Sequence, residues 1–402
     1  MIIDKSNKFK TTIISVRFKE KITKENVGLR ALLPNLMSAS TNVYKTRQAL
    51  SEALEDLYGA SINVRTTKTG LISIMEFSIY FINQSFTEEP IFEEALEILH
   101  EVVYGHKNLP KKEFELEKRL LLEKIASFDN DKTSFALSNL FETMFENEQY
   151  GIRTSGKIED VKPITYDILN RYYKEMLKTN DIDVVISGQV DESLLKLVSK
   201  YFIPRNNLAL NPIDYEDKQI EMIKNKVDYD TISQSKVNIG YRLPIRYKET
   251  LLPAATLFNT ALGGAVHSRL FVNVREKHSL CYYIGSRFDA FKGFMYIYSG
   301  IDKSRVDLAL KVIDEQIEDL QNQPLSETEL NLSKESIINA LIENQDSQSA
   351  SLANLYLQTL LNNPLTLAEQ IDKIRAVTPK EVQAIAKTIK KDTLYILAPE
   401  VK

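Results

Sequence analysis

The sequence predicts an α+β protein made of two homologous halves, each with antiparallel sheets covered by helices. Three observations lead to this prediction. Strand-like alternation of apolar and polar residues recurs in both halves of the 402-residue chain. Helical patterns lie between these strands and continue as long helical stretches. A segment without any period, residues 205–217, separates the two series.

The elements of the two halves follow from these patterns. In the first half we expect strands at residues 8–20, 61–67, 71–81 and 182–187, and helices at 25–38, 45–58, 165–177 and, with breaks near 108–110 and 129–131, over 86–145. Gly59 is placed to end the second helix in a left-handed conformation. In the second half we expect strands at 235–241, 282–290 and 294–299, and helices at 251–262 and over 306–361.

The halves look like copies of each other. A helix that begins at Thr165 leads to an apolar strand, and a matching helix begins at Thr378, 213 residues later. Residues 130–131, ahead of a helix, are matched by residues 345–346. The alternative is two unrelated α+β domains with similar helix–strand punctuation. We expect an N-terminal half at 1–204, a linker at 205–226 and a C-terminal half at 227–402.

The composition is that of an ordinary folded protein, with 43% hydrophobic and 26% charged residues. A net charge of −4 gives no basic excess for nucleic acid or an anionic membrane. The longest notable uncharged run, residues 251–268, is interrupted by proline and glycine and is a poor membrane span. The single cysteine cannot form an internal disulfide, and the N-terminus lacks a signal-peptide pattern. These features predict a cytoplasmic protein without nucleic-acid or membrane partners.

Residues 262–284 carry an ordered series of motifs. A Gly263-Gly264 pair is followed by Ser-Arg-Leu-Phe at 268–271, Arg-Glu-Lys from Arg275 and Leu-x-Tyr ending at Tyr282. This series resembles the pitrilysin/insulinase (M16) metallopeptidase family. With the internal repeat, the resemblance covers nearly the whole chain. It implies two homologous halves that form one side of a chamber for extended peptides.

The resemblance gives four residues of this series a role in substrate binding. Gly263 and Gly264 follow an apolar helix, where glycine permits a positive φ or a close backbone approach. Arg275 and Tyr282 are implied to hold the peptide backbone, and their guanidinium and phenol groups can both donate to a carbonyl oxygen. The alternative is that Arg275 pairs with a local carboxylate and Tyr282 packs in a strand. We expect no catalytic residue among them.

The zinc site is where the sequence departs from the family. Active members carry His-x-x-Glu-His on an early helix, with a further glutamate downstream. The histidine positions fall on Ala31 and Asn35, the general base on Pro34, and the downstream ligand on Lys124. Methyl and pyrrolidine carbons cannot ligate zinc, asparagine is a weak ligand, and an ammonium repels the ion. We therefore predict no metal and no cofactor, and a helix kinked at Pro34.

These observations predict a non-catalytic M16-type subunit. The resemblance implies that it pairs with an active zinc peptidase homologue, or self-associates, and contributes binding surface for a peptide substrate. One alternative is a hydrolase with an unrecognised site around Glu117, Glu123 and His100; Glu117 also matches a supporting acid of the family. Another is a purely structural M16-like subunit. Cys281 is expected to be a small buried hydrophobe rather than a nucleophile.

Overall fold

The computed structural model describes residues 1–216 and 219–400, which form two compact units. One unit contains residues 1–127, 152–212 and 348–360, and the other contains the described residues of 128–151, 213–347 and 361–402. Residues 217 and 218 of the predicted linker lie outside the described residues. Residues 224–226, also assigned to the linker, belong to a strand.

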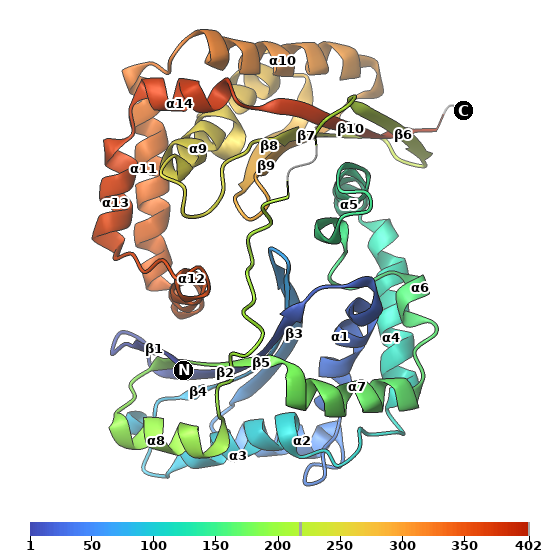
Figure 1. The fold of residues 1–402 in the computed structure, drawn as a ribbon, viewed down its shortest axis with the longest axis vertical. Helices are drawn as coiled ribbons and strands as arrows, with labels where there is room; N and C mark the ends of the chain where they lie inside the picture. The colour runs from blue at the N-terminus through green and yellow to red at the C-terminus, as the bar shows by residue number, and fades with distance from the viewer. Residues whose placement is uncertain (217–218, 401–402) are drawn as a thin grey trace. The chain divides into compact units, whose positions relative to one another are not determined.

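The first unit is built on a sheet with the strand order β1-β5-β2-β4-β3 (Figure 1). Its strands are β1 (Ile2–Lys5), β2 (Thr11–Lys21), β3 (Ser61–Thr69), β4 (Ile72–Ile82) and β5 (Asp181–Gly188). Its helices are α1 (Lys24–Met37), α2 (Arg47–Asp56), α3 (Ile91–Tyr104), α4 (Phe114–Ser127), α6 (Ile158–Val161), α7 (Tyr166–Thr179), α8 (Glu192–Tyr201) and α12 (Gln348–Leu360). β1 and β5 run parallel, and the other neighbouring strands run antiparallel.

The second unit is built on a sheet with the strand order β6-β10-β7-β9-β8. Its strands are β6 (Lys224–Asp230), β7 (Ser235–Arg242), β8 (Cys281–Asp289), β9 (Phe294–Ile301) and β10 (Lys390–Pro399). Its α-helices are α5 (Lys132–Met144), α9 (Leu252–Asn259), α10 (Val306–Asn322), α11 (Glu327–Glu343), α13 (Leu367–Ala376) and α14 (Pro379–Ala386). Two π-helical segments, Thr260–Gly264 and Leu270–Lys277, follow α9.

The two sheets repeat one topology. β6 and β10 run parallel while the other neighbours are antiparallel, as in the first sheet. The side chains of Thr165 and Thr378 cap α7 and α14, which lead into β5 and β10 at equivalent places. The predicted repetition is therefore confirmed. The sheets differ from the expected antiparallel form in one respect, because the first strand of each runs parallel to the last.

α12 comes from the second half of the sequence but packs in the first unit. Its Leu352 and Tyr356 lie in an apolar cluster with Val185 of β5. The Tyr356 hydroxyl donates to Asp183 at 3.0 Å, and the guanidinium of Arg17 lies 4.0 Å from the Tyr356 ring centre. A helix distant in sequence thus covers the face of the first sheet that carries these residues.

α5 is the matching helix of the second unit and comes from the first half of the sequence. Its Ala136 and Leu140 form an apolar cluster with Tyr395 and Leu397 of β10. A Cβ at Gly240 of β7 would meet the sulfur of Met144 at 2.6 Å, so a glycine there lets α5 approach the sheet closely. Each unit therefore contains one helix from the opposite half of the sequence.

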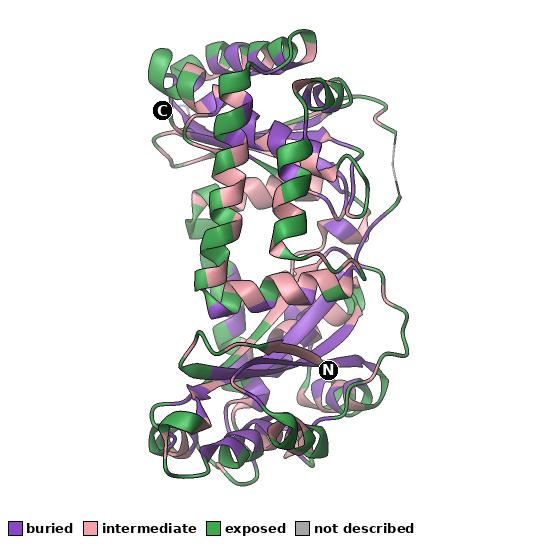
Figure 2. Cartoon of the chain, turned by 90° about the vertical axis from the view of Figure 1, so that its left-hand side faces the viewer, coloured by how far each residue is buried: buried purple, intermediate pink, exposed green. Residues whose placement is uncertain are grey.

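Buried residues concentrate on the strands and on the helix sides that face them (Figure 2). Local signals at element ends also behave as expected: Gly59 has φ +75° after α2. No helix within the described part of the chain is long and apolar enough to cross a membrane.

Replacing Leu140 of α5 with alanine should lower the free energy of unfolding by ~2–5 kcal/mol, because this fully buried side chain would leave a cavity against β10. The matched control is Leu308→Ala on α10, whose residue is 51% exposed and which should change stability by less than ~1 kcal/mol. Denaturant unfolding of the full chain measures both. Equal effects would contradict the packing of α5.

Candidate functional site

The residues that we predict to correspond to the family's zinc ligands lie on α1 and α4 of the first unit. α1 begins at a capping box formed by Thr23 and Asn26. Ala31 and Asn35 are one helical turn apart; Ala31 is half-buried and Asn35 is exposed. Lys124, on α4, is exposed as well. None of these three side chains offers zinc a strong ligand, so the residues present do not fit the ion.

Pro34 does not end α1, which continues to Met37. Proline has no amide N–H, and this leaves the carbonyl of Arg30, four residues earlier, without its helical partner. The hydroxyl of Thr66 on β3 donates to that carbonyl at 2.6 Å. A side chain of the neighbouring strand therefore supplies the hydrogen bond that Pro34 cannot make. The kink at Pro34 stays a prediction.

The acids near these positions have their own partners. Glu117 of α4 is buried and pairs with the guanidinium of Arg47 on α2. Glu123 is exposed and lies 3.9 Å from Arg119. Within the described residues, no three His, Cys, Asp or Glu side chains are grouped so that they could hold a metal ion.

His100, which the alternative hydrolase site would use, lies among aromatic rings. Its ring centre is 5.2 Å from that of Tyr104 and 5.9 Å from that of Phe202. Burial lowers the pKa of His100, while the charge of Glu101 opposes that shift. The structure pairs Glu117 with Arg47 and Glu123 with Arg119, and gives neither acid a contact with His100.

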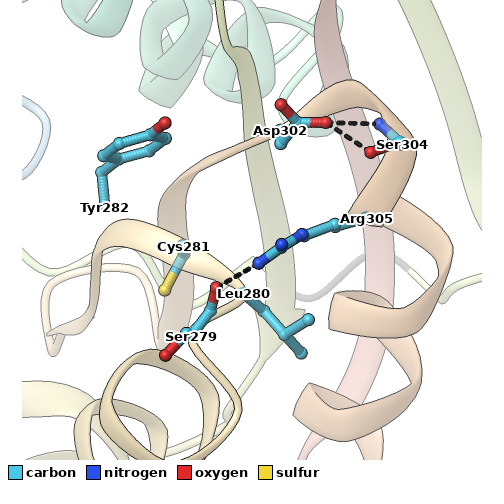
Figure 3. Close-up of a pocket in the computed structure, with 7 residues that line it drawn as sticks. All are labelled: Ser279, Leu280, Cys281, Tyr282, Asp302, Ser304 and Arg305. Carbon is cyan, nitrogen blue, oxygen red and sulfur yellow. Dashed lines mark hydrogen bonds between the residues drawn. The ribbon is translucent and has the colours of Figure 1, made fainter.

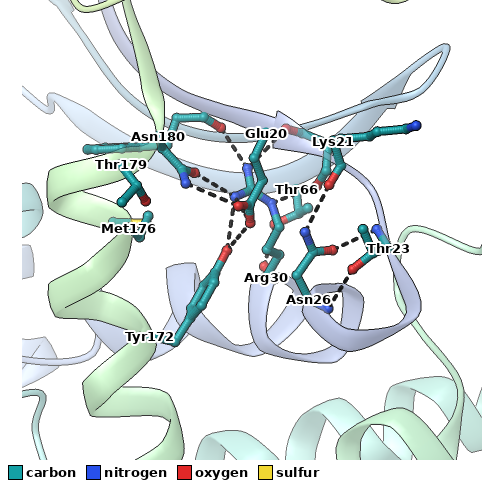
Figure 4. A network of polar contacts seen from close by, with 12 residues as sticks. Glu20, Lys21, Thr23, Asn26, Arg30, Thr66, Tyr172, Met176, Thr179 and Asn180 are labelled. Atoms are coloured by element: carbon teal, nitrogen blue, oxygen red, sulfur yellow. Dashed lines mark hydrogen bonds and ion pairs between the residues drawn. The ribbon is translucent and has the colours of Figure 1, made fainter. Parts of the chain in front are cut away.

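Arg30, one residue before Ala31, is the fully buried charge of this region (Figure 4). Its Nη1 donates to Glu20 at 2.7 Å, to Asn180 at 2.7 Å and to the hydroxyl of Tyr172 at 3.0 Å. Its Nε donates to the hydroxyl of Ser73 at 2.7 Å, and its Nη2 donates to two strand carbonyls. Every N–H group of the guanidinium thus has an acceptor.

The glycine pair of the second unit lies in the π-helical segment after α9. Gly263 is buried, and a Cβ there would meet the hydroxyl oxygen of Ser286 at 2.7 Å. Gly264 is exposed. Of the two reasons considered for glycine, a close approach therefore applies at Gly263, and neither residue has a positive φ. π-Helical turns are rare and occur frequently at functional sites.

Arg269, in the Ser-Arg-Leu-Phe motif, has a structural partner. Its Nε donates to Glu329 of α11 at 2.8 Å, and its Nη2 donates to the second carboxylate oxygen at 3.3 Å. Glu329 also completes the capping box of α11 with Ser326. This two-point ion pair ties the π-helical segment Leu270–Lys277 to the start of α11.

Arg275 and Tyr282, by contrast, are exposed. The guanidinium of Arg275 lies 4.6 Å from the ring centre of Phe271, and no described residue accepts a hydrogen bond from it. Tyr282 is 62% exposed and lies where the β8–β9 register shifts, a β-bulge that turns a side chain away from regular pairing. Its hydroxyl has no hydrogen-bond partner among the described residues either.

Tyr282 also lines a cavity of about 320 Å³ at the start of β8 (Figure 3). Arg305 donates to the carbonyl of Ser279 across this cavity at 2.7 Å. Cys281 is half-buried rather than fully buried, and burial raises the pKa of its thiol while the charge of Arg275 opposes that shift. A raised thiol pKa does not favour a nucleophile.

Comparison with known proteins decides the family. The Peptidase M16 inactive domain matches residues 163–337. The probable inactive metalloprotease YmfF of Bacillus subtilis is 30% identical over 98% of this chain and 94% of its own. The chain belongs to the M16 peptidase family. Both matches are to inactive members, and the chain is an inactive M16-like homologue.

Solved structures of similar proteins share the fold of this M16 homologue. A conserved protein from Enterococcus faecalis V583 matches with a TM-score of 0.92 at 29% identity, over 100% of this chain and 96% of that chain. The peptidase M16 inactive domain from Pseudomonas fluorescens matches with a TM-score of 0.80 at 17% identity, over 99% and 95%. The α+β prediction is thereby confirmed.

The sequence interpretation missed Arg30. A signal was present, because Arg30 lies three residues from both Val27 and Leu33, which are buried. This spacing places it on the inner face of α1. An arginine on an inner face implies a set of buried acceptors, but three of those acceptors, Ser73, Tyr172 and Asn180, lie 43, 142 and 150 residues away.

The purified M16 homologue should contain far less than one zinc per chain by elemental analysis, because the ligating side chains are absent at Ala31, Asn35 and Lys124. The control variant combines Ala31→His, Pro34→Glu, Asn35→His and Lys124→Glu, restores the family's donor types and should bind zinc. Stoichiometric zinc in the natural chain, lost on Glu117→Ala, would contradict the prediction.

Replacing Arg30 with methionine should destabilise the first unit by ~3–5 kcal/mol, because it leaves Glu20 without its buried partner. Arg171→Met on the exposed side of α7 is the matched control and should have little effect. Thermal and denaturant unfolding compare the two variants. A loss no larger than that of the control would show that the Arg30 network does not hold α1.

Proposed function

We propose that this chain is a non-catalytic M16 subunit that pairs with an active zinc peptidase homologue. In this proposal the partner supplies the metal and this chain supplies binding surface for an extended peptide substrate. A cytoplasmic location is part of the proposal, and a single cysteine that forms no internal disulfide fits it.

The observation that carries the proposal is that Arg275 and Tyr282 have hydrogen-bond donors without partners among the described residues. Both side chains are exposed, and neither donates a hydrogen bond to a described residue. Arg269, in the same series of motifs, differs from them because its guanidinium pairs with Glu329. Free donors at the start of an outer strand suit a ligand that brings carbonyl acceptors.

An extended peptide is such a ligand. Its backbone carbonyls point outward at intervals along the chain, and an outer strand such as β8 can pair with a peptide backbone directly. The bulge at Tyr282 places the phenol beside that edge. A guanidinium and a phenol there could hold one substrate carbonyl while the partner's metal acts on the peptide.

The hydrolase alternative is less well supported by the same structure. His100 lies against Tyr104, Tyr201 and Phe202. The two acids of the alternative site, Glu117 and Glu123, pair with arginines instead. A purely structural subunit would behave differently in one respect, because replacing Arg275 would then leave peptide turnover unchanged.

Arg275→Ala should lower the peptide turnover of the complex with its active M16 partner about tenfold. One charge-assisted hydrogen bond of ~1.5–3 kcal/mol would be lost, and 1.4 kcal/mol corresponds to a factor of ten. Tyr282→Phe, which removes only the hydroxyl, should give a smaller loss in the same direction. Cleavage assays on the co-expressed pair, normalised to folded complex, measure both.

Lys277→Ala is the matched control, since it removes an exposed positive charge from the same π-helical segment and should leave turnover unchanged. If Arg275→Ala lowers thermal stability and leaves activity per folded complex intact, the subunit is structural. Full activity from the partner alone would remove the proposed function.

A further inference from the structure

β6 (Lys224–Asp230) is an outer strand of the second sheet, at the edge opposite β8 (Figure 1). It pairs with β10 on one side, and no described strand pairs with its other side. Alternate residues of this seven-residue strand therefore direct their backbone N–H and C=O groups to the unpaired edge. Val227, at the centre, is 47% exposed, and Tyr229 is 61% exposed.

The other outer strands carry features that oppose pairing with a second copy of themselves. β1 has only four residues, and β8 has a register shift at its first residues, between Cys281 and Tyr283. β3 carries Arg65 and Lys68 but no acidic residue, so two copies of β3 would bring like charges together. β6 has none of these features.

The charges of β6 are arranged as a palindrome of opposite signs about Val227. The strand reads Lys-Asn-Lys-Val-Asp-Tyr-Asp, so both lysines precede Val227 and both aspartates follow it. We propose that β6 pairs antiparallel with β6 of a second copy of this chain, across a two-fold axis at Val227. Lys224 then lies opposite Asp230 of the second copy, and Lys226 lies opposite Asp228.

This charge pattern selects one register. In a dimer whose two-fold axis is perpendicular to the continuous sheet, each residue lies opposite a residue of the same face. The axis must therefore pass through a residue of the strand, and the neighbouring registers move it from one residue to the next. An axis at Lys226 would set two lysines against each other, and an axis at Asp228 would set two aspartates against each other. The axis at Val227 is the register in which each charge meets its opposite.

The central charges are accessible for this pairing. The side chains of Lys226 and Asp228 are 45% and 39% exposed and lie 3.3 Å apart within one strand. Lys224 and Asp230 are more engaged, since Lys224 donates to a carbonyl of α5 and Asp230 pairs with Lys132. We therefore assign most of the selectivity to the pair Lys226–Asp228.

The opposite face of β6 adds apolar contact. Val227 would lie against Val227 of the second copy, and Tyr229 against Asn225. The interface is isologous, as two-fold dimers require. It uses the edge away from Arg275 and Tyr282, so it does not depend on the proposed peptide-binding role.

Sedimentation equilibrium of the full chain tests the interface. A single strand pair is a small interface, so we expect a dimer at concentrations of roughly 10–100 µM. Val227→Lys puts like charges on the two-fold axis at a half-exposed position and should weaken the dimer at least tenfold. Leu308→Lys, an exposed position on α10, is the control and should leave it intact. A natural chain that stays monomeric at ~100 µM, or a dimer unaffected by Val227→Lys, would overturn the proposal.

A charge exchange makes the test specific to the register. Lys226→Asp and Asp228→Lys should each weaken self-association at least tenfold, because each creates like-charged pairs. An equimolar mixture of the two variants should dimerise again, since every pair in the mixed dimer is opposite in charge. Asp228→Lys also removes the acceptor of the Tyr395 hydroxyl, so circular dichroism checks its fold. Single variants that dimerise normally, or a mixture of folded variants that does not recover, would rule out this register.

Discussion

The buried guanidinium of Arg30 fixes the geometry on which the N-terminal site depends. A buried ion without partners costs several kcal/mol, so α1 is stable only where all acceptors of Arg30 are met at once. Those acceptors come from β2, β4, α7 and the residue that follows α7. Ala31 and Asn35 are consequently held in one fixed relation to the sheet and to α7. The helix α1 is thus firmly held although its predicted ligand positions carry no strong zinc ligand.

The two units repeat one topology but differ in where they carry exposed side chains that could bind a ligand. In the first, the helix after the second strand is α1, which carries no strong zinc ligand at the positions we predict for one. In the second, the helix in the equivalent place is α9, and the irregular π-helical turns after it lead to Arg275 and Tyr282. Repetition of the fold therefore does not repeat the site. Each sheet is also covered by a helix from the opposite half, so neither half of the sequence supplies a complete unit.

Features with a local cause could be predicted from the sequence, and features with a distant cause could not. Thr165 and Thr378 were identifiable because a cap acts within one turn, and Gly59 because a left-handed residue ends a helix. The parallel β1–β5 and β6–β10 pairs and the exchanged helices depend on contacts between segments far apart in the chain. β6 itself was assigned in part to the linker, because its alternating charged residues lack an apolar period.

The site residues show why metal chemistry and peptide recognition can separate. A zinc site needs several donors converging on one point at about 2 Å, so a helix with Ala31 and Asn35 at the predicted ligand positions does not form one. Recognition of an extended backbone is distributed along an edge, where single donors each contribute a part. A chain can therefore have no zinc ligand on α1 and still carry Arg275 and Tyr282 as exposed donors. Those two donors are exposed and have no partner among the described residues, and this favours a role in binding without catalysis.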